Sequence, residues 1–299
     1  MLCAVLWLAA CQSNGGQTPP ASTETEATQL RICGSDTELE LVQSLANAYH
    51  DSLGGFEVDI VGGGSVKGIT SLVAGEANMA NASRRMLKSE RKQAANNGLE
   101  LIEVILAQDA VAIITHSKIG VDSLSLQELA DIFEGRINNW KELGGPNLPI
   151  TLVGRNADSG THHYVKSRLD LSTYPENMTL LADHSSVFEA VRAQKGSIGY
   201  VDLGHMMDEN GKPTGAVWAM PVYVEGDRAY SPLESQWVAT GDYPLTRPLY
   251  QYLTQRAAGS LRAFARYELS TAGQDAVARA GFIRLNNVQA EINASCGLY

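Results

Sequence analysis

Residues 56–73 read Phe-Glu-Val-Asp-Ile-Val-Gly-Gly-Gly-Ser-Val-Lys-Gly-Ile-Thr-Ser-Leu-Val and contain the repeating unit of the fold. The first five residues alternate between apolar and acidic side chains, a period typical of a half-buried strand. Three glycines follow at once and give the backbone the freedom for a tight turn. The apolar residues after Ser65 recur at helical spacing. This stretch therefore predicts a strand, a glycine turn and a helix in direct succession.

The same succession recurs along the chain. Short apolar runs predict strands at residues 30–33, 101–106, 110–115, 150–153 and 198–201. Apolar residues at helical spacing follow at 39–49 and 126–133, and further helices begin after Thr161 and near Ser185 or Ser186. Strands that alternate with helices predict an α/β fold with a parallel or mixed sheet covered on both faces. In such sheets, ligands bind outside the carboxyl ends of the strands.

Three of the predicted strand-to-helix junctions share a composition that suits an oxyanion. They are Gly34-Ser-Asp-Thr37, Gly62-Gly-Gly-Ser65 and Asp158-Ser-Gly-Thr161. The first N–H groups of a helix lack internal partners and carry partial positive charge, and glycine lets a ligand approach them closely. A serine or threonine at one such junction is often only a helix cap. Three junctions together, with Arg155 before the last, favour an anion site, because a guanidinium supplies charge and a planar fork of donors.

The composition excludes several classes of protein. The formal net charge of the 299 residues is −10, which argues against nucleic-acid binding, where a basic face is expected. Hydrophobic residues make up 44% and charged residues 19%, as in an ordinary globular protein. A small anion is still compatible with this charge, since capture depends on the local field inside a cleft.

The N-terminus has the pattern of an exported lipoprotein. Residues 1–11 are apolar and too short to span a bilayer, and they end in Leu-Ala-Ala-Cys11, which resembles a lipobox. We therefore expect Cys11 to be lipidated. No Lys or Arg precedes the apolar run, so a chance apolar start or a start codon further upstream stays open. Residues 12–28 contain no large apolar side chain and predict a flexible tether.

Two cysteines remain in the predicted folded body, Cys33 and Cys296. An oxidising compartment would permit a disulfide between them. The sequence does not give their separation, so a disulfide and two free thiols are both open.

The chain resembles the phosphate-specific substrate-binding proteins of bacterial ABC transporters, the PstS type, from about residue 30 to residue 285. The resemblance is carried by several motifs: Gly34-Ser-Asp-Thr37, Gly62-Gly-Gly-Ser-Val-Lys-Gly-Ile69, Ala82-Ser-Arg84, Leu129-Ala-Asp-Ile-Phe-Glu-Gly-Arg-Ile-Asn-Asn-Trp140, Arg155-Asn-Ala-Asp-Ser-Gly-Thr161, Gly196-Ser-Ile-Gly-Tyr-Val201 and Tyr243-Pro-Leu-Thr-Arg-Pro-Leu-Tyr250. The arginine-to-Ser-Gly-Thr motif and the run that ends in Asn139-Trp140 are specific together.

The resemblance implies a periplasmic-binding-protein fold, in which two α/β lobes joined by a two-crossing hinge close on phosphate. It implies lobe 1 at residues 29–111 plus 248–299 and lobe 2 at residues 112–247, with crossings near 108–114 and 243–250. It also implies ABC permease subunits as partners, a monomeric protein without a cofactor, and a periplasmic location with a lipid anchor in the membrane. By position, the implied phosphate ligands are Asp36, Thr37, Ser65, Arg155, Ser159, Gly160 and Thr161, with Ser35, Gly64, Ser83 and Arg84 near the site.

Two positions depart from the family pattern. Arg84 stands where some members carry an acidic acceptor, and Asp36 stands where a neutral or small residue is common. Phosphate keeps a proton that sulfate lacks, so a carboxylate in the site would accept from phosphate and repel sulfate. We hypothesise that Asp36 has this role; the alternative is that it caps its helix.

Other functions are weaker alternatives. The same fold could bind sulfate or molybdate, or the chain could sense phosphate without transport. A phosphate-ester hydrolase would need a metal cluster or an activated nucleophile. His162 and His163 are adjacent and would point about 100° apart on a helix, which makes them a poor chelating pair. We therefore expect neither a metal site nor catalysis.

Overall fold

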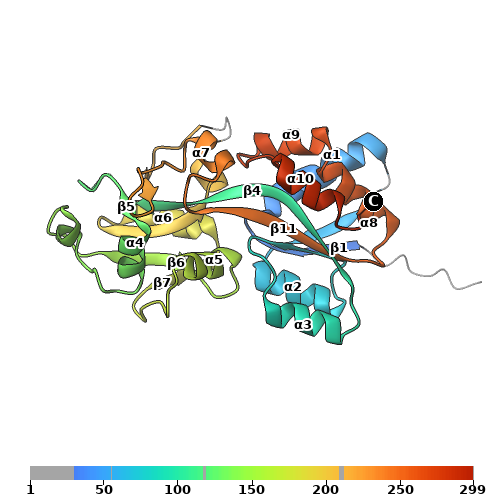
Figure 1. Ribbon diagram of the computed structural model, residues 1–299, viewed down its shortest axis with the longest axis horizontal. Helices are drawn as coiled ribbons and strands as arrows, with labels where there is room; N and C mark the ends of the chain where they lie inside the picture. Colours follow the sequence, from blue (N-terminus) through green and yellow to red (C-terminus); the bar gives the residue numbers. More distant parts are fainter. Residues whose placement is uncertain (1–29, 55, 117–118, 209–211, 299) are drawn as a thin grey trace, which may run out of the picture.

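The computed structural model describes residues 30–54, 56–116, 119–208 and 212–298 (Figure 1). The predicted signal at residues 1–11, with Cys11, and the predicted tether at residues 12–28 lie outside these residues. None of the described helices combines the length and apolarity that a membrane crossing requires.

The described residues form two α/β lobes that lie side by side (Figure 1). Lobe 1 contains β1 (Leu30–Gly34), α1 (Leu39–Leu53), β2 (Val58–Val61), α2 (Ser65–Ala74), β3 (Met79–Ala82), α3 (Lys88–Asn96), α8 (Gly259–Glu268), α9 (Thr271–Arg279) and α10 (Asn287–Ala294). Lobe 2 contains β5 (Leu124–Ser125), α4 (Leu126–Phe133), η1 (Trp140–Leu143), β6 (Thr151–Arg155), α5 (Gly160–Arg168), β7 (Thr179–Leu181), α6 (His184–Ala193), β8 (Ser197–Asp202), η2 (Gly204–Met206), β9 (Trp218–Ala219), β10 (Val222–Tyr223) and α7 (Ser235–Thr240).

Two long antiparallel strands connect the lobes. They are β4 (Leu101–Thr115) and β11 (Thr246–Thr254), which cross the waist of the molecule in Figure 1. The main sheet has the order β2-β1-β3-β11-β4-β8-β6-β7, with β9 also paired to β4. The first part of β4 pairs with β11 in lobe 1, and its last five residues pair with β8 in lobe 2. The predicted two-lobed α/β fold with two crossings is confirmed.

The separate strands predicted at residues 101–106 and 110–115 are wrong, because β4 is continuous. The polar residues Gln108 and Asp109 lie between the two apolar runs, in register opposite Pro248 and Arg247 of β11. A buried strand can contain a polar residue whose side chain is hydrogen-bonded, and Asp109 accepts two hydrogen bonds from Arg247.

The core of lobe 1 has two parts, one on each face of the sheet. On one face, α1, α8 and α9 pack around Leu45 and Phe264, and on the other α2 packs around Ile69. Consecutive residues of β3 face opposite sides of the sheet, as the two-residue period of a strand requires. Met79 packs in the core with Leu45 and Phe264, and Ala80 packs in the core with Ile69. Lobe 2 has its own core, in which Trp140 is fully buried and donates its indole N–H to the carbonyl of Gly196.

Cys33 and Cys296 are both free thiols in the structure, so of the two alternatives the disulfide does not form. Cys33 is buried in β1, inside the sheet, whereas Cys296 follows α10 and is partly exposed. Cys33 therefore lies in the sheet layer of lobe 1, and Cys296 lies in the helix layer that covers the sheet.

Candidate functional site

The lobe 2 side of the candidate site is the junction between β6 and α5. Arg155 ends β6, and Ser159 is the N-cap of α5, with its hydroxyl accepting from the N–H groups of Thr161 and His162. Arg155, Ser159 and Thr161 are buried, with at most 1% of their surface exposed. The first turn of a nine-residue helix and a buried guanidinium therefore lie together, and both supply positive potential.

The lobe 1 side consists of two further junctions. Thr37 lies in the turn between β1 and α1, and Ser65 begins α2 directly after the glycine turn. Gly64 caps α2 with a φ of 92°, a left-handed conformation that favours glycine. The hydroxyl of Ser65 accepts from the N–H of Ser83, at 3.0 Å, which holds the end of β3 against α2. The junctions predicted from the sequence therefore converge in space.

The two sides touch each other without room for an extra methyl group. A Cβ on Gly160 would lie 2.2 Å from the hydroxyl oxygen of Ser65 and 2.4 Å from that of Ser83. A Cβ on Gly64 would lie 2.3 Å from the carbonyl oxygen of Asp158, and this carbonyl accepts from the N–H of Val66 at 3.2 Å. The N-termini of α2 and α5, from different lobes, therefore meet directly, and their glycines permit the approach.

Asp36 and Arg155 form an ion pair between the lobes. The guanidinium Nη2 donates to Oδ2 of Asp36 at 2.6 Å, and Oδ1 of Asp36 accepts from the N–H of Gly63 at 2.7 Å. The alternative that Asp36 caps its helix is wrong: the N-cap position of α1 is Glu38, and no side chain caps that helix. Both carboxylate oxygens of Asp36 instead accept hydrogen bonds at the interlobe site, one from Arg155 and one from Gly63.

The position of Arg155 is set by lobe 2. Its Nη2 also donates to the carbonyl of Ala182, and its own carbonyl accepts from Nδ1 of His162 at 2.8 Å. Burial lowers the pKa of His162, so this ring is a neutral donor that positions the arginine backbone. The buried Nε of Arg155 and the hydroxyl of Ser35 have no hydrogen-bond partner among the described residues. Unsatisfied buried donors are rare, and here they suit a ligand whose oxygen atoms accept hydrogen bonds.

Sequence reasoning missed the buried arginine of β11. Arg247 donates twice to Oδ2 of Asp109, at 2.7 and 2.9 Å, and its Nη1 donates to the hydroxyl of Thr161 at 3.0 Å. Its Nη2 lies 3.4 Å from the hydroxyl of Thr37, so one arginine contacts a threonine of each lobe. Arg247 belongs to the Tyr243–Tyr250 motif, but nothing in its spacing indicated that β11 would carry it into the site.

Sequence reasoning also missed His184, at the start of α6. Its Nε2 lies 3.1 Å from the hydroxyl of Thr37 and 3.3 Å from that of Thr161. Burial lowers the pKa of His184 to about 3, so the ring is neutral at physiological pH. A neutral imidazole adds a hydrogen-bonding group beside the two threonines without adding charge.

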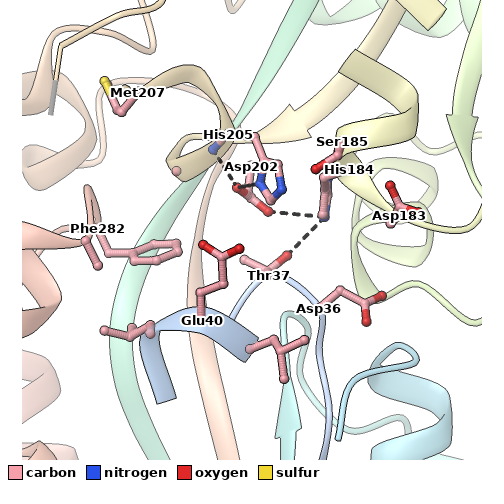
Figure 2. Close-up of a pocket in the computed structure, with 14 residues that line it drawn as sticks. Asp36, Thr37, Glu40, Asp183, His184, Ser185, Asp202, His205, Met207 and Phe282 are labelled. Carbon is pink, nitrogen blue, oxygen red and sulfur yellow. Dashed lines mark hydrogen bonds and ion pairs between the residues drawn. The ribbon is translucent and has the colours of Figure 1, made fainter. Parts of the chain in front are cut away.

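A cavity of about 610 Å³ adjoins these residues and is drawn in Figure 2. Thr37, His184 and the carboxylates of Glu40 and Asp202 face one another across it in Figure 2. The carboxylates of Asp36 and Asp183 also line the cavity. Burial raises the pKa of Asp202, but the neighbouring His205, whose backbone N–H donates to Oδ1 of Asp202, opposes this rise. The net pKa of Asp202 lies below its ordinary value. The carboxylates make this cavity unfavourable for an anion, whereas the donors of Ser65, Ser159 and Arg155 lie outside its lining.

Two residues predicted to lie near the site differ in what they do. Ser83 contacts Ser65 and lies against Gly160, within the junction. Arg84 points elsewhere, because its two terminal nitrogens form a bidentate pair with Glu90, at 2.7 and 2.9 Å. Within the described residues, no group of three or more His, Cys, Asp or Glu side chains is arranged to hold a metal ion.

The fold and this interlobe site define a class of binding protein. The sequence profile of the PBP superfamily domain matches residues 19–272, which is most of the chain. The chain therefore belongs to the PBP superfamily, and its predicted resemblance to the PstS type is confirmed by its relatives.

Two of those relatives are identical to the chain at 27% and 28% of the aligned positions. It is 27% identical over 275 residues to the phosphate-binding protein PstS of Bacillus subtilis, covering 89% of this chain and 86% of that protein. It is 28% identical over 251 residues to protein SphX of Synechococcus elongatus, covering 81% of this chain and 73% of that protein.

Among solved structures, the chain is similar to a putative phosphate ABC transporter substrate-binding protein from Clostridium perfringens with bound phosphate. The TM-score is 0.75 at 28% identity, and the match covers 86% of this chain and all of that protein.

Proposed function

We propose that this chain is a solute-binding protein that captures inorganic phosphate between its lobes and delivers it to an ABC importer. The observation that carries the proposal is the meeting of two helix N-termini, at Ser65 and at Ser159–Thr161, beside the buried guanidinium of Arg155. Such an arrangement supplies backbone, hydroxyl and charged donors to one small oxyanion. The relatives named as phosphate-binding proteins support phosphate as that anion.

Lobe closure is the proposed mechanism of capture. Thr37 and Ser65 belong to lobe 1, and Arg155, Ser159, Gly160 and Thr161 to lobe 2, so only the closed arrangement presents all the proposed ligands together. Closure removes water, and hydrogen bonds to a charged ligand become stronger in a dry site. Asp36 would accept the proton that phosphate retains, and its ion pair with Arg155 holds its carboxylate at the interlobe site.

The geometry favours binding over ester hydrolysis. Thr37, His184 and Asp202 superficially suggest a hydroxyl–imidazole–carboxylate relay. However, the hydroxyl and the carboxylate both lie against the same ring nitrogen, Nε2, at 3.1 and 3.2 Å, and Nδ1 has no partner among the described residues. A relay needs the carboxylate on the opposite nitrogen from the nucleophile. This arrangement therefore suits a positioning role.

Calorimetric titration of the mature domain with phosphate, arsenate and sulfate tests the proposal. We expect saturable 1:1 binding of phosphate and arsenate and much weaker binding of sulfate. Binding of sulfate or molybdate in preference to phosphate would assign another oxyanion to the same site. Hydrolysis of a phosphate ester by the same preparation would contradict a pure binding role. Permease and ATPase genes beside this one would favour transport over a sensor.

We further propose that the protein is exported and held at the membrane by lipid on Cys11, with residues 12–28 as the tether. The lipobox pattern and the composition of the tether support this. Expressed with its native signal, the Cys11→Ser variant should leave the membrane fraction or stay unprocessed. Partition with lipid equal to that of the wild type would disprove the anchor.

A further inference from the structure

A second cavity, of about 950 Å³, lies where the loop before α3 in lobe 1 meets α5 of lobe 2. Figure 1 shows α3 and α5 on the same side of the molecule, away from α9 and α10. The cavity shares no lining residue with the acidic cavity of Figure 2. Its volume falls within the range of about 300–1,000 Å³ that is typical of small-molecule sites. It is therefore a separate space, and of its lining residues only Arg247 also contacts the proposed phosphate ligands, through Thr161 and Thr37.

The charge of this second cavity is predominantly positive. Arg84, Arg85, Lys88, Arg91, Lys166 and Arg247 line it. The arginines are paired, Arg84 with Glu90, Arg85 and Arg91 with Glu103, and Arg247 with Asp109. Among the described residues, Lys88 and Lys166 take part in no ion pair. One of these lysines comes from each lobe, and together they exceed the one carboxylate of the lining, that of Asp170.

A buried donor adds an independent indication of a ligand. Arg84 is only 6% exposed, and its Nε has no hydrogen-bond partner among the described residues. Its bidentate pair with Glu90 uses the two terminal nitrogens and leaves Nε unused. A buried guanidinium nitrogen without a partner is costly unless an acceptor reaches it.

The remaining lining is mostly apolar and aromatic, with His163, Ser167 and Asp170 as its polar residues. Met86, Leu87 and Leu171 contribute aliphatic surface, and Tyr164 and Tyr250 contribute rings. Leu87 is 46% exposed, which makes it one of the few large apolar side chains of the described chain that face solvent. A site for inorganic phosphate alone has no use for such surface, whereas an apolar body beside an acidic group would contact both kinds of lining.

We propose that this cavity is a second binding site, for a small organic anion with an apolar ring and one acidic group. The acidic group lies between Lys88 and Lys166, within reach of Arg84, and the ring lies against Leu87 and Tyr250. The ligand contacts both lobes at once. This inference goes beyond phosphate capture and does not depend on it.

Calorimetry with naphthalene-2-sulfonate, on the mature domain saturated with phosphate, tests the second site. Inorganic sulfate supplies the charge without the ring, and 2-naphthol supplies the ring without the charge. We expect saturable 1:1 binding of naphthalene-2-sulfonate and at least about tenfold weaker binding of either control compound. Equal binding of 2-naphthol would show an apolar surface without anion selectivity and would overturn the proposal.

Variants place the probe in the cavity. The double variant Lys88→Glu/Lys166→Glu should weaken naphthalene-2-sulfonate binding at least about tenfold. The matched control Lys92→Glu/Lys195→Glu makes the same charge change at exposed lysines outside the cavity, and should leave the affinity unchanged. Equal losses in both double variants, or no saturable binding to the wild type, would overturn the second site. A phosphate titration of each preparation reports separately on the interlobe site, so failure of one proposal is distinguishable from failure of the other.

Discussion

Asp36 of lobe 1 and Arg155 of lobe 2 form an ion pair across the interlobe site, with Nη2 and Oδ2 separated by 2.6 Å. The arginine side chain is 2% exposed and the aspartate side chain 20% exposed, so the pair lies in a largely dry environment. Charge-assisted hydrogen bonds are strong there, and an unpaired charge is costly. The pair therefore links closure of the lobes to the electrostatics of the anion site.

Replacement of Arg155 should remove the principal positive charge of the site. We expect Arg155→Ala to weaken phosphate binding more than tenfold, because truncation of one partner of a buried charge pair typically costs about 2–5 kcal/mol. Calorimetry gives the affinity, and circular dichroism confirms that the fold is retained. Wild-type affinity in a folded variant would place Arg155 outside the phosphate site.

Replacement of Asp36 should change selectivity more than affinity. Asp36→Asn removes the repulsion of a fully ionised anion and adds an N–H donor from which such an anion can accept, so the ratio of the sulfate dissociation constant to the phosphate dissociation constant should fall. Sites built around a hydrogen-bonded group can discriminate by about 10⁴–10⁵. The control Glu40→Gln neutralises a carboxylate that lines the neighbouring cavity and should leave the ratio unchanged. An unchanged ratio in Asp36→Asn at equal ionic strength would assign the selectivity to another residue.

A methyl group on Gly160 should oppose closure. Its Cβ would lie 2.2 Å from the Ser65 hydroxyl, which belongs to the other lobe, so we expect Gly160→Ala to weaken phosphate binding at least about tenfold. The melting temperature without ligand should not fall, because alanine is a better helix residue than glycine. Gly259→Ala is a matched control, since Gly259 also begins a helix and has no atom within 4 Å of its Cβ position. Equal phosphate affinity of the two variants would contradict the tight contact between the junctions.

Arg247 and Asp109 should be interdependent for stability. Both side chains are at most 1% exposed, and burial raises the pKa of Asp109 while Arg247 opposes this rise. Arg247→Met leaves a buried carboxylate without its partner and should cost about 3–5 kcal/mol in the free energy of unfolding. Arg247→Met/Asp109→Asn should recover most of this loss in urea denaturation. A double variant no more stable than Arg247→Met would show that the guanidinium acts through packing instead.

Glu268 should make the stability depend on pH. Burial raises its pKa from 4.5 to about 8, while a hydrogen bond from Gln251 partly opposes the rise. The folded protein therefore holds a proton that the unfolded chain releases above pH 4.5, and stability is lost as the pH rises from 4.5 to 8.

Glu268→Gln has no proton to lose and keeps the shape and the contact with Gln251. Its stability advantage over the wild type should be small at pH 4.5 and grow to the order of a few kcal/mol at pH 8. Urea denaturation across this range measures the difference. A constant difference at all pH values would mean that Glu268 is ionised in the folded protein.

The sequence by itself determined the local elements and the chemistry that they carry. Alternation before Gly62 and helical spacing after Ser65 predicted β2 and α2, because side-chain periodicity is a local property of the backbone. The glycine turn and the Ser159-Gly160-Thr161 junction predicted helix N-termini that could serve an anion. Arg155 was predicted beside them because it is only four residues from Ser159.

Only the tertiary structure decided which distant residues meet. Arg247 enters the site because β11 pairs with β4 in a register that places it opposite Asp109, and His184 enters because α6 begins at the same interlobe surface. Strand register and lobe closure depend on contacts between residues far apart in sequence, and no local period encodes them. The same reason explains why Asp36, which sequence alone left open as a helix cap, pairs with an arginine 119 positions away.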